Sequence, residues 1–145
     1  MKLIVDTNII FSCLLNTNNE LSKIIFFAND DIKFYSCNYM LDEISNHWEK
    51  LRKYSKLDDK ALKISYLKIL SRINFVNENL IPLNIWKESE INVSEIDEYD
   101  IDFVALTRFL NGKLWTSDKK LFNHLKHNKF IEVISTNELK VKIKW

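Results

Sequence analysis

Two aspartates directly follow short apolar stretches, at points where a strand is expected to turn into a helix. Asp6 comes after residues 2–5 (KLIV), and Asp118 comes after the stretch 114–116. A carboxylate at the end of a buried strand is costly unless a cation or hydrogen bonds receive it. Each aspartate is also a good N-cap for the helix that follows, so capping alone would account for either one.

Two further acidic features fall on expected helices. Glu43 lies at the border of the apolar stripe of its helix, whereas Asp42 faces solvent. The stretch 95–102 holds five acids in eight residues. Within it, Asp97 and Asp100 share one helix face and Asp102 is turned away. The helix dipole favours acids at a helix N-terminus, but five acids so close repel one another, and a cation would relieve that repulsion.

The residue types in these places indicate which ion would suit them. Oxygen ligands without a histidine or cysteine partner suit the hard cations Mg²⁺ and Mn²⁺, which bind phosphates and activate water for attack on a phosphodiester. His47, His124 and His127 have no partner at metal-ligand spacing, so we expect them to be solvated or half-buried. Cys13 and Cys37 are expected to be buried, reduced thiols rather than a disulfide.

The composition is that of a single domain spanning residues 1–145. Apolar residues make up 46% and charged residues 28% of the chain, and Gly112 and Pro82 are its only glycine and proline, so no linker is expected. There is no signal-peptide layout and no apolar run long enough to span a membrane, which favours a cytoplasmic protein.

The net charge of +1 conceals an asymmetry, because residues 78–102 carry −7 and residues 113–145 carry +5. Such charge runs are most often solvated helix faces.

Apolar periodicity predicts an α/β protein in which short strands alternate with helices. Strands are expected at 2–5, 33–37, 73–76, 114–116 and 131–134. Helices are expected at 9–15, 20–29, 38–54, 58–72, 83–91, 98–110 and 118–127. This alternation predicts a central parallel sheet of four to five strands covered on both faces, with sites beyond the carboxyl ends of the strands. Asp6 and Asp118 would then point to the same edge. Gly112 is expected as a left-handed helix cap, and residues 138–145 as an extended tail packed on the domain or on a second subunit.

Three segments resemble the PIN domain family, and together they span residues 3–122. They are VDTNIIFSCLL, MLDEISNHWEKL and DEYDIDFVALTRFLNGKLWTSDKKL. The most specific part is D-x-x-D-x-x-F-V-A-L followed by G-K-L-W-T-x-D. The resemblance implies a three-layer α/β/α Rossmann-like PIN fold with a central parallel sheet. It also implies a Mg²⁺- or Mn²⁺-dependent endoribonuclease that cleaves single-stranded RNA.

The resemblance also assigns roles to individual residues. The positions that match the family's catalytic and metal-binding acids are Asp6, Glu43, Asp100 and Asp118, with Asp97 as an additional metal ligand and Asn8 and Thr116 as polar supports. Asp102 departs from the family pattern, because a small or apolar residue is more usual there.

The expected partners are RNA, a small antitoxin of the VapBC type and a second copy of the chain. The lysine-rich flanks are the expected nucleic-acid contacts, through Arg52, Lys53, Lys56, Lys113, Lys119 and Lys120. One alternative is a catalytically idle PIN-like module with a binding or regulatory role, although none of the matching acids is missing. A receiver-type phosphoacceptor domain is disfavoured, because that would need paired acids near the N-terminus.

Overall fold

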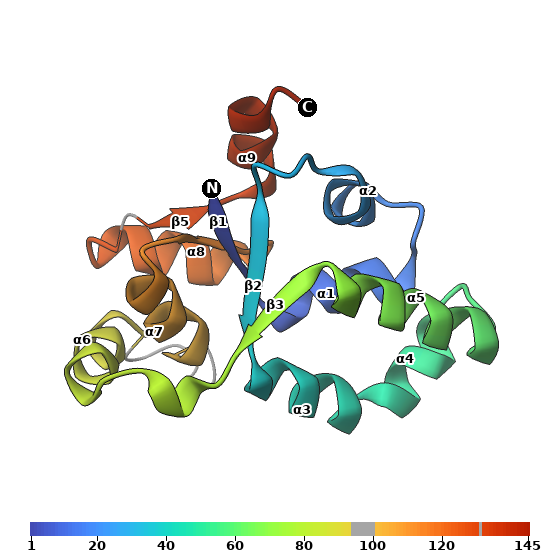
Figure 1. Ribbon diagram of the computed structural model, residues 1–145, viewed down its shortest axis with the longest axis horizontal. Coiled ribbons are helices and arrows are strands. Elements are labelled where there is room, and N and C mark those ends of the chain that lie inside the picture. The colour runs from blue at the N-terminus through green and yellow to red at the C-terminus, as the bar shows by residue number, and fades with distance from the viewer. Residues whose placement is uncertain (94–100, 131) are drawn as a thin grey trace.

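Five short strands form one parallel sheet in the order β3-β2-β1-β4-β5 (Figure 1). This computed structural model describes residues 1–93, 101–130 and 132–145. The strands are β1 Lys2–Val5, β2 Lys33–Cys37, β3 Ile73–Val76, β4 Lys113–Trp115 and β5 Val133–Ile134. The central parallel sheet predicted from the sequence is therefore confirmed, with five strands.

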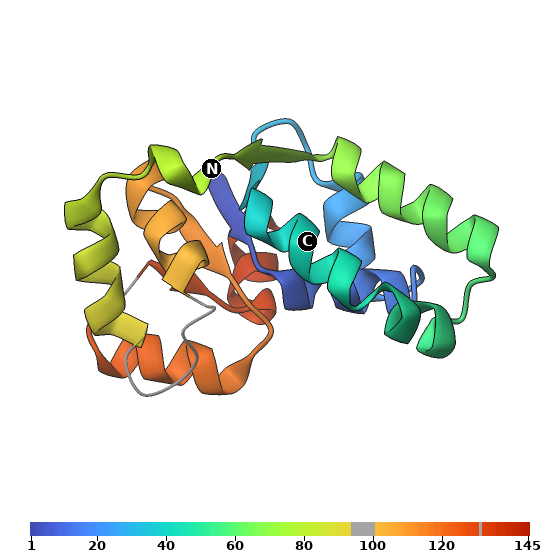
Figure 2. The ribbon, with the colours of Figure 1, turned by 90° about the horizontal axis from the view of Figure 1, so that it is seen from below.

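Helices cover the sheet on both sides, which gives the expected α/β/α layering. In Figure 1 and in the view from below in Figure 2, α6 and α7 lie to the left of β1, whereas α1, α4 and α5 lie to its right. The helices are α1 Thr7–Leu15, α2 Glu20–Phe27, α3 Asn38–Asn46, α4 Trp48–Tyr54, α5 Asp59–Ser71, α6 Leu83–Val93, α7 Ile101–Leu110, α8 Lys119–His127 and α9 Thr136–Ile143, with a 3₁₀ turn η1 at Glu78–Leu80. Within the described residues, no helix has the length and apolar character needed to cross a membrane.

The order of the strands determines where a site can form. The chain moves outward from β1 through β2 to β3, and then returns to place β4 and β5 on the other side of β1. The direction of winding therefore reverses between β1 and β4. In open parallel sheets, ligands bind beyond the carboxyl ends of the strands at such a reversal. Asp6 follows β1 and Asp118 lies three residues beyond the end of β4, so both residues occur at this point.

The core is formed by strands whose apolar side chains are buried on both faces. Residues 3–5 of β1 are fully buried. The rings of Phe34 in β2 and Trp115 in β4 pack with their centroids 6.2 Å apart. Cys13 and Cys37 are both buried and free, as the sequence predicted.

The predicted helix over 38–54 is wrong in one respect. Two helices occupy this range, α3 and α4, and they meet at His47, whose backbone (φ −107°, ψ 14°) leaves the helical conformation. The apolar stripe continues across the break, because Ile44 and Leu51 are both buried. Because the apolar spacing is unbroken, periodicity alone could not predict the break at His47.

Gly112 does not have the predicted left-handed conformation. The residue with positive φ at the end of α7 is Asn111 (φ 53°). Gly112 is needed for a different reason, which is close packing. A Cβ atom at this position would lie 2.5 Å from Cδ1 of Ile4 and 2.8 Å from the carbonyl oxygen of Lys2. Only glycine allows the chain to enter β4 this close to β1.

The C-terminal tail is a helix, so the extended tail predicted for residues 138–145 is wrong. Helix α9 starts with a capping box, in which Ser135 Oγ accepts a hydrogen bond from the N–H of Glu138, and the Glu138 carboxylate accepts one from the N–H of Ser135. Leu139 is buried, and Lys140 forms an ion pair with Glu20 of α2. The tail therefore packs on its own domain, as expected, but as a helix.

Candidate acidic site

Asp6 is the most deeply buried acid of the site, with 2% of its surface exposed. It caps α1, because its Oδ1 accepts a hydrogen bond of 3.0 Å from the N–H of Ile9. Its Oδ2 is buried and has no hydrogen-bond partner among the described residues. The pKa of Asp6 is raised to about 6, mainly by burial and to a smaller extent by the charges of Asp118 and Glu43, against the lowering effect of Thr116 and Ile9. The cap therefore satisfies only half of this carboxylate.

Glu43 reaches the same place from α3. Its Oε1 accepts a 2.5 Å hydrogen bond from the hydroxyl of Thr7, the first residue of α1. Glu43 is half-buried, whereas Asp42 is exposed, as the helical pattern predicted. The bond to Thr7 fixes the Glu43 carboxylate beside the end of β1, close enough to influence the pKa of Asp6.

Asp118 closes the site on the side of β4. It caps α8, and its Oδ1 accepts both of the capping bonds, 3.0 Å from Lys120 N–H and 3.1 Å from Leu121 N–H. The buried hydroxyl of Thr116 accepts a 3.1 Å hydrogen bond from the N–H of Asp118 and also acts on Asp6. Thr116 thus connects the two aspartates, and its supporting role stays a prediction.

Two acids that sequence reasoning did not assign extend the site toward β3. Asp102 is half-buried in the first turn of α7, and burial together with the charges of Glu78 and Glu43 raises its pKa to about 6. One ligand atom from each of Cys37, Glu78 and Asp102 lies within 4.8 Å of the other two. Burial and these acids also raise the pKa of the Cys37 thiol far above its usual value. Asp102 is the departure from the family pattern, and it lies toward the site rather than away from it.

A sequence signal existed for Glu78 but not for Asp102. Glu78 comes two residues after β3, so the rule that marked Asp6 and Asp118 would also have marked it. Its Oε2 accepts a 3.0 Å hydrogen bond from the N–H of Tyr39 in α3. The position of Asp102 in the site could be predicted only by knowing where α7 begins. Asp97 and Asp100 lie outside the described residues, and their assignment stays a prediction.

Helix N-termini partly compensate the charge of this acidic cluster, which we define as Asp6, Glu43, Glu78, Asp102 and Asp118. Helices α1, α3 and α8 all begin at this edge, with Asp6, Cys37 and Asp118 as their N-cap residues. The positive ends of their dipoles face the cluster. They favour carboxylates there but do not supply a partner for Asp6 Oδ2.

The donor set of the acidic cluster fits a hard divalent cation. All five of its carboxylates are linked electrostatically. Glu43 and Asp118 raise the pKa of Asp6, and Glu78 and Glu43 raise the pKa of Asp102. Carboxylate oxygens are the ligands that Mg²⁺ and Mn²⁺ prefer. A buried oxygen without a partner, such as Asp6 Oδ2, is the position that a cation would satisfy. The residues present therefore fit the metal that the sequence predicted.

The remaining predicted residues are spread over the surface. Asn8 is exposed on α1, and the hydroxyl that binds Glu43 belongs to its neighbour Thr7. Lys119 and Lys120 are exposed in the first turn of α8, beside Asp118. Lys113 begins β4, at the opposite edge of the sheet, and pairs with Glu132 at 3.2 Å.

The other basic flank lies on α4 and the loop that follows it. Arg52 forms ion pairs with Glu49 (3.0 Å) and Asp59 (2.7 Å), whereas Lys53 and Lys56 are exposed. The two basic flanks thus lie on different elements. Lys119 and Lys120 are the predicted basic residues that lie beside an acid of the cluster, Asp118.

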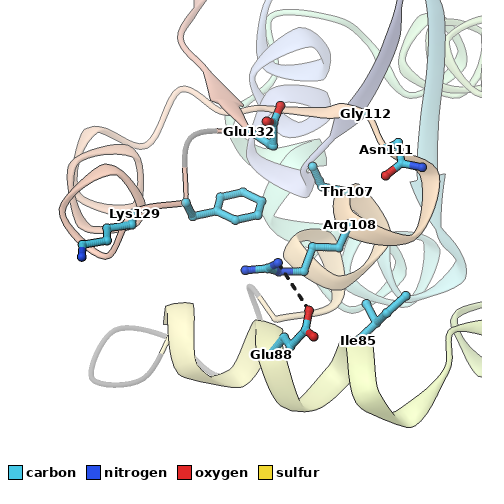
Figure 3. Close-up of a pocket in the computed structure, with 9 residues that line it drawn as sticks. Ile85, Glu88, Thr107, Arg108, Asn111, Gly112, Lys129 and Glu132 are labelled. Atoms are coloured by element: carbon cyan, nitrogen blue, oxygen red, sulfur yellow. Dashed lines mark ion pairs between the residues drawn. The ribbon is translucent and has the colours of Figure 1, made fainter.

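A separate hollow of about 540 Å³ lies at the amino ends of β4 and β5 (Figure 3). Arg108 extends across it from α7 toward Glu88 of α6, at 3.6 Å, and also donates a 2.5 Å hydrogen bond to Asn92. Its guanidinium lies over the ring of Phe130, 5.1 Å from the centroid. These contacts hold α6 against α7 and bring Arg108 against Phe130, which follows α8. The hollow is on the opposite edge of the sheet from the acidic cluster, so it does not belong to the same site.

Comparison with known proteins agrees with the observed fold. A family model described as "PIN domain" matches residues 4–139. VapBC2 from Rickettsia felis, crystallised with a DNA fragment from their promoter, superposes with a TM-score of 0.69 at 15% identity, covering 93% of this chain and 98% of that chain. PAE2754 from Pyrobaculum aerophilum superposes with a TM-score of 0.66 at 16% identity, covering 99% and 96%. No curated protein matches the chain significantly. At these identities the two structures show the fold alone.

Proposed function

Because the chain belongs to the PIN domain family, we propose that it is a Mg²⁺- or Mn²⁺-dependent endoribonuclease that cleaves single-stranded RNA in the cytoplasm. The observation that carries the proposal is the buried Oδ2 of Asp6, which has no partner among the described residues and lies beside Glu43 and Asp118. A buried carboxylate in this state is destabilising unless a ligand completes it, and functional sites are where such strain is retained.

In this proposal the acids have distinct roles. Asp6, Asp118 and Asp100 hold the cation, and Glu43 either binds it or orients the attacking water. Thr7 fixes Glu43 through its 2.5 Å hydrogen bond, and Thr116 fixes the backbone of Asp118. Such supporting bonds keep ligands in place and tune their basicity.

The proposed reaction is hydrolysis of a phosphodiester bond. A water oxygen attacks phosphorus, the bond from phosphorus to the leaving ribose oxygen breaks, and that oxygen takes up a proton. A divalent ion supplies charge neutralisation at the phosphate and lowers the pKa of water. Glu43 is suited to receive the proton of the attacking water, because its carboxylate is half-buried and oriented by Thr7.

The test is cleavage of a panel of single-stranded RNAs by the purified chain with Mg²⁺, Mn²⁺ or EDTA. We expect cleavage with either metal and none in EDTA, and loss of cleavage in Asp6→Asn, Glu43→Gln and Asp118→Asn. The matched control is Asp58→Asn, because Asp58 caps α5 with a 2.8 Å bond from Ala61 N–H but lies outside the cluster. If no RNA is cut and neither metal stabilises the fold, the chain is an idle binding or regulatory module instead.

We also propose that the chain acts as a toxin with a small antitoxin partner and forms a homodimer. The fold match to VapBC2 supports a partner of this kind. Co-expression with the product of a short adjacent open reading frame should give a stable complex and suppress cleavage. Sedimentation of the purified chain should give the mass of a dimer. Cleavage that is unchanged by co-expression would exclude that product as the antitoxin, and a sedimenting monomer would exclude the homodimer.

A further inference from the structure

A hollow of about 330 Å³ adjoins the acidic cluster on the side of β4 and β5. Its size is at the lower end of the range of about 300–1,000 Å³ that small-molecule sites occupy. Thr116 and Asp118 belong to both the hollow and the site, so anything bound in the hollow lies next to the proposed metal ligands. Its wall is completed by Ser117, Lys119, Phe122, Asn123, Ser135, Thr136 and Asn137.

The chemistry of this wall differs from that of the acidic cluster. Apart from Asp118, the side chains that line it are hydroxyls, amides, one ammonium and one phenyl ring. Amides and hydroxyls both donate and accept hydrogen bonds, as the edges of nucleobases require. A phenyl ring offers a flat face on which a base can stack. The ammonium of Lys126 lies over the Phe122 ring, 5.5 Å from its centroid.

The hollow is also rigidly built. It lies where the helices after β4 and β5 begin, and both helices are capped. The hydroxyl of Thr136 accepts a 3.0 Å hydrogen bond from Nε1 of Trp115, a fully buried residue. The backbone of the hollow and the Thr136 hydroxyl are therefore held in place, which a site that recognises a base needs in order to discriminate.

Two other hollows lack this combination. The hollow at the amino ends of β4 and β5 is on the opposite edge of the sheet from the acidic cluster. Its Arg108 pairs with Glu88, and its Glu132 pairs with Lys113. A groove of about 620 Å³ between α3, α4 and α5 is lined by Ile44, Ser45, Trp48, Glu49, Lys63, Tyr66 and Leu67, and it includes none of the acidic cluster. The hollow beside Asp118 thus combines a place next to the acidic cluster, polar lining side chains and the aromatic face of Phe122.

We infer that the hollow beside Asp118 binds the base of one unpaired nucleotide next to the scissile phosphate. The inference rests on the proposed nuclease function and names the part of the substrate that this surface recognises. Phe122 stacks on the base, and Asn123 and Asn137 bind its edge. A base held in a Watson–Crick pair cannot enter, because its edge is already occupied and its faces are covered by its neighbours. The hollow therefore selects single-stranded RNA.

The first experiment measures binding without cleavage. Asp6→Asn serves as the parent, and its affinity for a labelled single-stranded RNA hexamer and for a duplex of the same sequence is measured by fluorescence anisotropy. We expect Phe122→Leu, which keeps an apolar side chain but removes the flat face, to weaken single-strand binding about tenfold. The double variant Asn123→Ala/Asn137→Ala should weaken it and alter the preference among bases. Duplex binding should change by less than about twofold, because only backbone contacts remain.

Matched controls come from exposed residues of the same types elsewhere. Phe27→Leu changes an exposed phenylalanine of α2, and Asn84→Ala changes an exposed asparagine of α6. Neither should alter binding. If Phe122→Leu and the double asparagine variant bind the single strand as tightly as the parent does, the inference is overturned.

The second experiment locates the bound group. Backbone amide shifts of the metal-free wild type are followed while AMP, CMP, GMP, UMP or inorganic phosphate is added. We expect nucleotide-specific shifts within 116–123 and 135–137. Equal shifts with inorganic phosphate would show a phosphate site and overturn the inference. Nucleotide-specific shifts at these positions in a chain that cuts no RNA would refute the nuclease function but support base binding in the hollow, so the two failures are distinguishable.

Discussion

Replacing Asp6 with asparagine should stabilise the metal-free protein while abolishing its activity. Asparagine keeps the oxygen that accepts the hydrogen bond from Ile9 N–H, so the cap of α1 survives. It removes the negative charge of the carboxylate and replaces Oδ2, which is buried without a partner among the described residues. The side-chain amide that replaces Oδ2 can donate to neighbouring carboxylates. A substitution of a buried, capping residue usually destabilises, so the predicted sign is unusual.

The magnitude follows from the pKa of Asp6, which burial raises from 3.8 to about 6. One pKa unit corresponds to about 1.4 kcal/mol, so the ionised carboxylate costs the fold up to about 3 kcal/mol at neutral pH. We expect Asp6→Asn to recover about 1–3 kcal/mol of this. For a domain of this size, that gain raises Tm by roughly 3–10 °C.

The pH dependence has a definite sign. Because the folded-state pKa of Asp6 is raised, the folded protein binds the proton more tightly than the unfolded chain does. The destabilisation is absent below about pH 4, grows as pH rises from 3.8 to about 6, and is constant above that range. The stability difference between Asp6→Asn and wild type should therefore be full at pH 7.5 and close to zero at pH 4.

The assay is thermal unfolding in EDTA and in Mn²⁺, at pH 7.5 and at pH 4. Mn²⁺ at 100 times its Kd should stabilise the wild type by about 2.7 kcal/mol at pH 7.5, and Asp6→Asn by much less. Asp58→Asn, at a solvent-exposed cap with the same geometry, should change neither Tm nor the metal response. If Asp6→Asn lowers Tm in EDTA at pH 7.5, the Asp6 carboxylate is already well satisfied, and the physical case for a cation there is lost.

Four further outcomes test other parts of the structure. Changing Lys119 and Lys120 to glutamine should reduce the salt slope of RNA binding by roughly 1.4, since each single-strand phosphate contact contributes about 0.7, as filter binding at several salt concentrations will show. Gly112→Ala should destabilise by about 1–3 kcal/mol in urea, because its Cβ would overlap Ile4 and Lys2. Cys13, buried and with its pKa raised to about 11, should resist iodoacetamide at pH 8 until the chain is unfolded. Deleting residues 140–145 should lower Tm, because the ion pair to Glu20 and part of α9 are lost.

The elements that could be predicted from the sequence are those set by local pattern and by one topological rule. Residues 3–5 of β1 form an apolar run that ends at Asp6, and such runs form strands buried on both faces. Parallel strands place their carboxyl ends at one edge, so Asp6 and Asp118 could be expected together before any coordinates were known. The position of Glu43 followed from helical spacing in the same way.

The features that sequence reasoning missed depend on contacts between distant segments. The period of two in residues 138–145 suggested a strand, but the capping box of Ser135 and Glu138 starts a helix, and local capping overrode the weaker pattern. Gly112 is required by the side chain of Ile4, more than 100 positions away in the chain. Asp102 lies near Glu43 and Glu78 because α7 begins at that edge of the sheet, with Asp102 in its first turn.

Capping and metal binding were competing interpretations of Asp6 and Asp118 at the level of sequence, and the structure shows why they do not exclude each other. A carboxylate has two oxygens. In both residues the capping hydrogen bonds are accepted by Oδ1 alone, from Ile9 N–H in one case and from Lys120 and Leu121 N–H in the other. The cap fixes the direction of the carboxylate and leaves Oδ2 for another partner. The capping hydrogen bonds at the start of α1 and α8 thus hold the two carboxylates in position. The oxygen of Asp6 that has no partner among the described residues is the one that a cation would bind.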